Sequence, residues 1–109
     1  MSRAAVIYAR ISKDRVGAGL GVERQEQECR DLAEQLGWTV VGVHTDNDLS
    51  AYTGKRRPGY EQLLRDLKDG RADGVLVWHT DRLHRSPSEL EEYVTIGEAR
   101  GVATHTVKA

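Results

Sequence analysis

Apolar and polar positions follow two different periods along this chain, one typical of strands and one typical of helices. Four short stretches are apolar and rich in β-branched residues, a pattern that predicts strands buried in a sheet. These stretches are 3–10, 38–45, 73–80 and 101–107. Between them lie three longer stretches in which apolar residues recur three and four positions apart, which predicts helices with one buried face.

The first two helices have recognisable ends. The first spans 22–36, and Gly37 is placed to end it. The second begins at Pro58, because proline suits the first helical turn, and Gly70 follows its end. The residues expected on their buried faces are Cys29, Leu32, Ala33 and Leu36 in the first helix, and Tyr60, Leu63, Leu64 and Leu67 in the second.

The third helix has a capping box. Ser86 and Glu89 have the S-x-x-E spacing, and Pro87 occupies the first helical position between them. We expect this helix to run to about Arg100, with one side lined by Leu90, Tyr93, Val94 and Gly97.

The alternation of strands and helices predicts the fold class. Strand-helix-strand connections are right-handed in nearly all known cases, so the simplest α/β arrangement is a single-domain, three-layer parallel sheet with helices on both faces. The expected strand order is 2-1-3-4. In such sheets the binding crevice lies beyond the carboxyl ends of the strands where the order reverses, here between strands one and three.

Composition limits the function classes. The 109 residues suit one domain, and Cys29 is the only cysteine, which fits a reducing compartment and excludes an intrachain disulfide framework. The sequence has no membrane-spanning stretch and no signal peptide, so we expect a cytoplasmic protein. Sixteen Lys and Arg against seventeen Asp and Glu give a net charge of −1, so a nucleic acid would have to bind at a local basic cluster.

Polar residues interrupt the first strand near its end. Tyr8, Arg10 and Ser12 alternate with Ala9 and Ile11, so the three polar side chains project from one side. One interpretation is a binding or catalytic edge. The other is a strand that emerges at the surface with a solvated arginine and a turn serine.

A second cluster follows the third strand at the same edge. Arg82 and Arg85 are three positions apart, just before the capped helix start, which is a suitable arrangement for binding phosphate. Asp81 could orient Arg82, which we favour, or take part in proton transfer. The alternative is a surface cluster of ion pairs between Asp81 and the arginines, which would contribute little energy.

The reaction classes can be narrowed from these residues. The sequence places no histidine and aspartate pair around Ser12, so a proteolytic triad is not expected. The four histidines are scattered, which predicts no metal site, and the glycines at 17, 19 and 21 match no nucleotide motif, which predicts no cofactor. A serine near arginines suits attack on a phosphodiester, because guanidinium groups pair with phosphate oxygens and stabilise charge in the transition state.

The segments "YARIS" and "DRLHR", some seventy residues apart, resemble the Y-x-R-x-S and D-R-L-x-R motifs of the serine recombinases, the resolvase and invertase family. The glycine-rich insertion before "ERQ", the segment "DNDLSAYTGKRRPGY" and "VWHTDRLHR" look most like the large serine integrases.

The resemblance implies DNA recombination through a 5′-phosphoserine intermediate. Ser12 would be the nucleophile, Arg10, Arg82 and Arg85 would hold the scissile phosphate with Asp81 beside them, and Tyr8 would support the serine strand. Supporting positions implied by the family pattern are Gln25, Ser50, Arg57 and Lys68. Their alternatives are a helix-surface amide for the glutamine, a turn serine, and solvated charges for the arginine and the lysine.

The resemblance also concerns partners and domain content. Family members act on DNA in a synaptic tetramer of two dimers, and they continue into a long dimerisation helix and a DNA-binding region that residues 1–109 do not supply. We therefore expect an isolated or truncated catalytic domain that is inactive and monomeric alone. Two alternatives are a non-catalytic phosphate- or nucleotide-binding module and an interaction domain from a degenerate recombinase.

Overall fold

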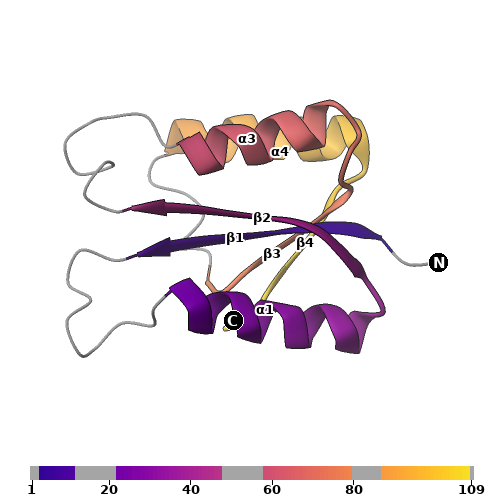
Figure 1. Ribbon diagram of the computed structural model, residues 1–109. Coiled ribbons are helices and arrows are strands. Elements are labelled where there is room, and N and C mark those ends of the chain that lie inside the picture. The colour runs from indigo at the N-terminus through magenta and orange to yellow at the C-terminus, as the bar shows by residue number, and fades with distance from the viewer. Residues whose placement is uncertain (1–2, 12–21, 48–57, 80–86, 109) are drawn as a thin grey trace.

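Strands and helices alternate in the computed structural model, which describes residues 3–11, 22–47, 58–79 and 87–108 (Figure 1). The strands are β1 (Ala4–Ile11), β2 (Thr39–Asn47), β3 (Gly74–Val77) and β4 (Ala103–Thr106). The helices are α1 (Val22–Leu36), α3 (Pro58–Lys68) and α4 (Pro87–Arg100). All strand pairs are parallel and the order is β2-β1-β3-β4, so the predicted α/β class and the strand order 2-1-3-4 are confirmed.

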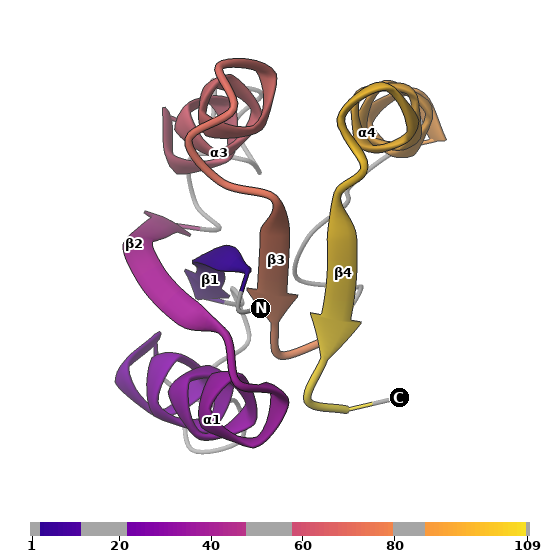
Figure 2. The ribbon, with the colours of Figure 1, turned by 90° about the vertical axis from the view of Figure 1, so that its right-hand side faces the viewer.

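The sheet forms the middle of three layers. Figure 2 shows α1 on one face of the sheet and α3 and α4 on the other. Successive residues of β1 contact opposite layers, since side chains alternate along a strand. Ala5 and Ile7 pack with Cys29 and Ala33 of α1. On the other face, Val6 and Tyr8 belong to a cluster with Tyr60, Leu63, Leu64 and Leu67 of α3 and with Tyr93 and Ile96 of α4.

Each helix ends where a glycine adopts a left-handed conformation. Gly37, Gly70 and Gly101 have φ angles of 75°, 77° and 67°. The residue after each glycine donates its amide back to a carbonyl of the last helical turn, as Trp38 does to Ala33 at 2.9 Å and Val102 does to Gly97 at 3.0 Å. These bonds define Schellman motifs, and they confirm that Gly37 and Gly70 end the first two helices.

The strands differ in length from their predicted spans. β2 continues to Asn47, two residues past the predicted end, because Asp46 and Asn47 still pair with Arg10 and Ile11 of β1. β3 contains only four residues, because the described ladders with β1 and β4 both end at Val77. The carboxyl edge of the sheet is therefore formed by long ends of β1 and β2 beside a short β3.

A β-bulge changes the register of β2. Ala5 pairs with Val40 but Val6 pairs with Gly42, so Val41 has no partner in the ladder, and it is 53% exposed. One extra residue moves every later side chain to the opposite face. As a result Val40 and Val43 both pack on the α1 side, although they are three positions apart, while His44 and Asp46 face α3.

The prediction of which residues line the buried side of the third helix is partly wrong. Tyr93 is buried as expected, but Leu90 and Val94 are exposed, and Ile96 is buried instead. α4 lies beside α3 over the β4 edge of the sheet (Figure 2), so the sheet covers only a narrow strip of its surface.

Cys29 is fully buried, and this burial, together with the negative charges of Glu28 and Glu26, raises the pKa of its thiol from 9.0 to about 12. Since the thiolate is the nucleophile, we predict that iodoacetamide does not modify Cys29 in the folded protein at pH 8. In urea the thiol regains its ordinary pKa and reacts. Mass spectrometry at increasing urea concentration measures both states, and rapid labelling without urea would contradict the prediction.

Candidate functional site

A buried carboxylate joins β1, β2 and α3 at the carboxyl edge of the sheet. Asp46 of β2 is only 7% exposed. Its Oδ2 accepts hydrogen bonds from the Tyr8 hydroxyl at 2.7 Å and from the Tyr60 amide at 2.8 Å, and its Oδ1 accepts one from the Gly59 amide at 2.9 Å. The first amides of a helix lack intrahelical partners and carry partial positive charge. Asp46 therefore satisfies the start of α3 and fixes the Tyr8 side chain at the same time.

The contact between Asp46 and α3 requires glycine at position 59. A Cβ atom there would lie 2.7 Å from the Thr45 carbonyl oxygen and 3.0 Å from Asp46 Oδ2. Both distances are shorter than normal contacts, so a larger residue would push the helix start away from β2.

Asp46 was not among the site residues predicted from the sequence. The predicted strand ended at Thr45, which placed Asp46 in a polar loop. One signal in the sequence could have identified it. Asp46 directly follows an apolar stretch, and a helix that begins with proline comes next. The bulge at Val41, which turns Asp46 toward α3, cannot be read from the alternation of side chains.

Gln25 of α1 holds the main chain of Arg10 from the other face. Its Nε2 donates to the Arg10 carbonyl oxygen at 3.0 Å, and its Oε1 accepts from the Arg10 amide at 3.3 Å. The amide side chain thus forms both backbone hydrogen bonds, as a residue of a neighbouring strand would. Gln25 is 0% exposed, so the alternative of a helix-surface amide is wrong.

Tyr8 and Arg10 are both buried at the end of β1. Tyr8 is fully buried and meets the ring of Tyr60 edge-on, with ring centroids 5.9 Å apart. Arg10 is 9% exposed, so it is not the solvated arginine of the surface-strand alternative. Tyr8 and Arg10 pair with His44 and Asp46 of β2, the two residues of this strand end that face α3.

The remaining predicted residues of the reacting centre lie outside the described part of the chain. They are Ser12, Ser50, Arg57, Asp81, Arg82 and Arg85. In the sequence they belong to three segments that follow β1, β2 and β3. Because these strands are parallel, all three segments start from the same edge of the sheet.

Lys68 lies at the other end of α3. It is the last residue of that helix, whereas Gly59 and Tyr60 at its start contact Asp46. The Lys68 ammonium lies 3.9 Å from Glu92 of α4, and the Lys68 carbonyl oxygen accepts a hydrogen bond from Arg100. The structure therefore brings Tyr8, Arg10 and Gln25 together but does not bring Lys68 to them.

Within residues 3–11, 22–47, 58–79 and 87–108, no three His, Cys, Asp or Glu side chains are placed to share a metal ion. No helix in this part of the chain is both long enough and apolar enough to span a bilayer.

Residues 5–109 match the family model described as "Resolvase, N terminal domain". Among similar solved structures is the C-terminal catalytic domain of ISC1926 TnpA, an IS607-like serine recombinase. It is 28% identical with a TM-score of 0.76, and the match covers 97% of this chain and 68% of that one.

Two further structures have the same fold at 23% identity and a TM-score of 0.74. One is the N-terminal catalytic domain of TP901-1 integrase, where the match covers 95% of this chain and 76% of that one. The other is a resolvase family site-specific recombinase from Streptococcus pneumoniae, with coverages of 95% and 71%. Since integrase and IS607-like domains are both similar, the resemblance to large serine integrases stays a prediction.

We predict that Tyr8→Phe lowers the free energy of unfolding by about 2 kcal/mol, because its hydroxyl donates to a buried carboxylate. The matched control is Tyr93→Phe, whose hydroxyl contacts the neutral hydroxyl of Thr104 and should contribute about 1 kcal/mol. Urea unfolding measures both. Equal losses would show that the charge of Asp46 adds nothing to the Tyr8 contact.

We predict that Gln25→Met lowers the free energy of unfolding by about 3 kcal/mol, because it leaves the amide and carbonyl of Arg10 without these partners inside the protein. Hydrogen exchange at the Arg10 amide should accelerate in this variant. The control Gln27→Met changes an exposed residue of the same helix and should cost about 0.5 kcal/mol or less. A Gln25→Met variant as stable as this control would contradict the prediction.

Proposed function

Because the chain belongs to the resolvase family of serine recombinases, we propose that it catalyses site-specific DNA recombination with Ser12 as its nucleophile. The observation that carries this proposal is the buried end of β1, where Gln25 fixes the main chain of Arg10. Ser12 follows two residues later in the sequence. A strand end held in this way is a suitable base for a nucleophile that must meet a phosphate at a defined distance.

The proposed reaction exchanges one ester bond for another. The Ser12 oxygen attacks a DNA phosphorus and loses its proton, a serine-phosphate bond forms, and the bond to the 3′ oxygen breaks. That oxygen leaves with a proton as a free 3′-hydroxyl, and the 5′-phosphate stays on the serine. Attack by a 3′-hydroxyl on the phosphoserine reverses the step, so a new DNA partner is joined without an external energy source.

The charge of the phosphate determines the roles of the other residues. We assign Arg10, Arg82 and Arg85 to the phosphate oxygens, because guanidinium groups pair with them and stabilise the extra charge of the transition state. Asp81 orients Arg82. Ser50 and Arg57 support the same centre, whereas the place of Lys68 at the far end of α3 favours an indirect role.

DNA is the proposed partner, and self-association into dimers and a synaptic tetramer brings two duplexes together. Two of the similar structures are described as catalytic domains, at the C-terminal end of one protein and the N-terminal end of another. We accordingly assign recognition of the DNA sequence to other parts of the full-length protein, and the reaction to the cytoplasm, where the DNA lies.

We predict that the full-length protein forms a covalent DNA adduct that Ser12→Ala abolishes. A cognate duplex is first selected from a random DNA library by binding to the full-length protein. Labelled duplex is then incubated with each variant, and denaturing gels detect the adduct. Mass spectrometry should place the phosphate on Ser12.

The matched control is Ser88→Ala, which changes an exposed serine in the first turn of α4 and should leave adduct formation unchanged. An adduct that persists in Ser12→Ala would remove Ser12 as the nucleophile. Binding without any adduct in the unsubstituted protein would favour a non-catalytic phosphate-binding module.

A further inference from the structure

β1 extends past the last backbone pair that joins it to β3, whereas β3 ends at that pair. That pair is Tyr8 with Val77, in the described part of the chain. Arg10 lies two residues beyond it on β1, and Trp78 directly follows the end of β3. At this edge the ladder alone therefore does not fix the two strand ends relative to each other.

Two side chains of α1 bind these two strand ends. Gln25 binds the main chain of Arg10, as described above. One turn later, Glu28 accepts a hydrogen bond from the Trp78 indole Nε1 at 2.9 Å, between residues fifty positions apart. Residues three apart lie on the same side of a helix, so one face of α1 contacts both strands.

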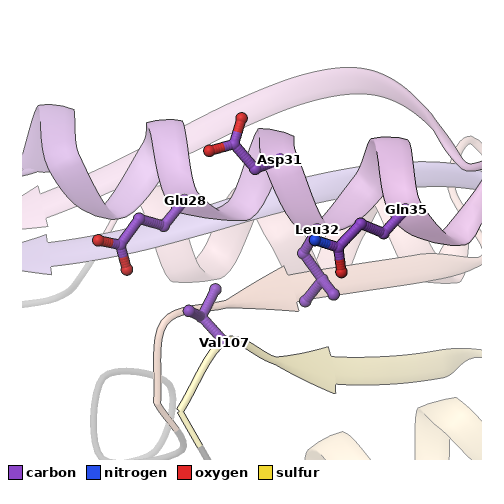
Figure 3. A pocket seen from close by; sticks show the side chains of 5 residues that line it. All are labelled: Glu28, Asp31, Leu32, Gln35 and Val107. Carbon is purple, nitrogen blue, oxygen red and sulfur yellow. The ribbon is translucent and has the colours of Figure 1, made fainter.

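The Glu28 carboxylate is itself held in place. Its Oε2 lies 3.1 Å from Arg24 Nε, which leaves Oε1 for the indole. Glu28 lines a groove of about 310 Å³ together with Asp31, Leu32, Gln35 and Val107. Figure 3 shows these side chains, with Glu28 on α1. The carboxylate is half-buried, so its hydrogen bond to the indole is only partly screened by water.

Trp78 is fixed from its other side by the chain that follows β4. Its carbonyl oxygen accepts a hydrogen bond from the Lys108 amide at 2.8 Å, next to the bond from the Val107 amide to the Val77 carbonyl oxygen at 3.1 Å. The main chain of Trp78 is thus bound to the chain that follows β4, and its side chain is bound to α1. A substitution of Glu28 should therefore change the rate of hydrogen exchange at the Lys108 amide.

We propose that Glu28 is a positioning residue that, together with Gln25, sets the end of β3 relative to the end of β1. Its importance for catalysis rests on the proposed function. In the sequence Ser12 follows β1, and Arg82 and Arg85, which we propose bind the phosphate, follow Trp78. Gln25 and Glu28 therefore hold the two strand ends from which these segments start.

The structural test uses NMR on this chain. It has two indole N–H signals, from Trp38 and Trp78, and Trp38→Phe assigns them. In Glu28→Ala we expect the Trp78 indole signal to move upfield and the Lys108 amide to exchange about tenfold faster. The matched control is Glu26→Ala, because Glu26 also forms an i,i+4 ion pair, and its partner Arg30 lies within α1 rather than on a strand end. Trp78→Phe, which keeps an aromatic ring but lacks the donor, should accelerate exchange at Lys108 in the same way.

The catalytic test measures the rate of Ser12 adduct formation in the full-length protein. We expect Glu28→Ala to lower this rate about tenfold, which corresponds to about 1.4 kcal/mol. Glu28→Gln should restore most of the rate, since its amide oxygen still accepts a hydrogen bond from the indole. Glu26→Ala should leave the rate unchanged.

Two results would overturn the proposal. One is an unchanged Trp78 indole signal in Glu28→Ala, together with unchanged exchange of the Lys108 amide in both Glu28→Ala and Trp78→Phe. The other is an active protein in which Glu28→Ala forms the adduct as fast as Glu26→Ala. If the unsubstituted protein forms no adduct, the proposed function fails, and the NMR comparison alone decides whether Glu28 sets the end of β3.

Discussion

The carboxylate of Asp46 is the constraint on which the carboxyl edge of the sheet depends. A buried carboxylate is costly unless hydrogen bonds replace its water, and here three donors from two other elements do so. The Tyr8 hydroxyl comes from β1, and the amides of Gly59 and Tyr60 come from the start of α3. Asp46 of β2 thereby fixes the Tyr8 side chain of β1 and the first turn of α3.

α1, on the opposite face of the sheet, binds the same edge through other side chains. α1 contributes a neutral amide, Gln25, to the main chain of Arg10, and a carboxylate, Glu28, to the indole of Trp78. Strand ends held from both layers lose little further conformational freedom when a substrate binds. This matters for the reaction we propose, in which arginine groups surround a phosphate, because electrostatic stabilisation is greatest when the charged groups are already in position.

The relation between sequence and structure is clearest in β2. The stretch "TVVGVHT" has valines in both of its alternating sets of positions, so its pattern fits either register and does not reveal the bulge at Val41. A slip of one residue would place Asp46 on the α1 side, opposite Ile11, and would separate it from Tyr8 and α3. The tertiary contacts of Asp46, and that of His44 with Asp66 at 2.7 Å, exist only in the bulged register.

The sequence by itself determined the strand and helix alternation, the glycines that end the first two helices, the strand order and the paired "YARIS" and "DRLHR" motifs. Periodicity, capping and handedness are local rules, and they act before distant residues meet. Only the tertiary structure decided that Gln25 is buried against Arg10, that Asp46 belongs to the site and that Leu90 and Val94 are exposed on α4. Each of these depends on which layer lies opposite a residue, and that follows from strand register and helix placement between segments far apart in the chain.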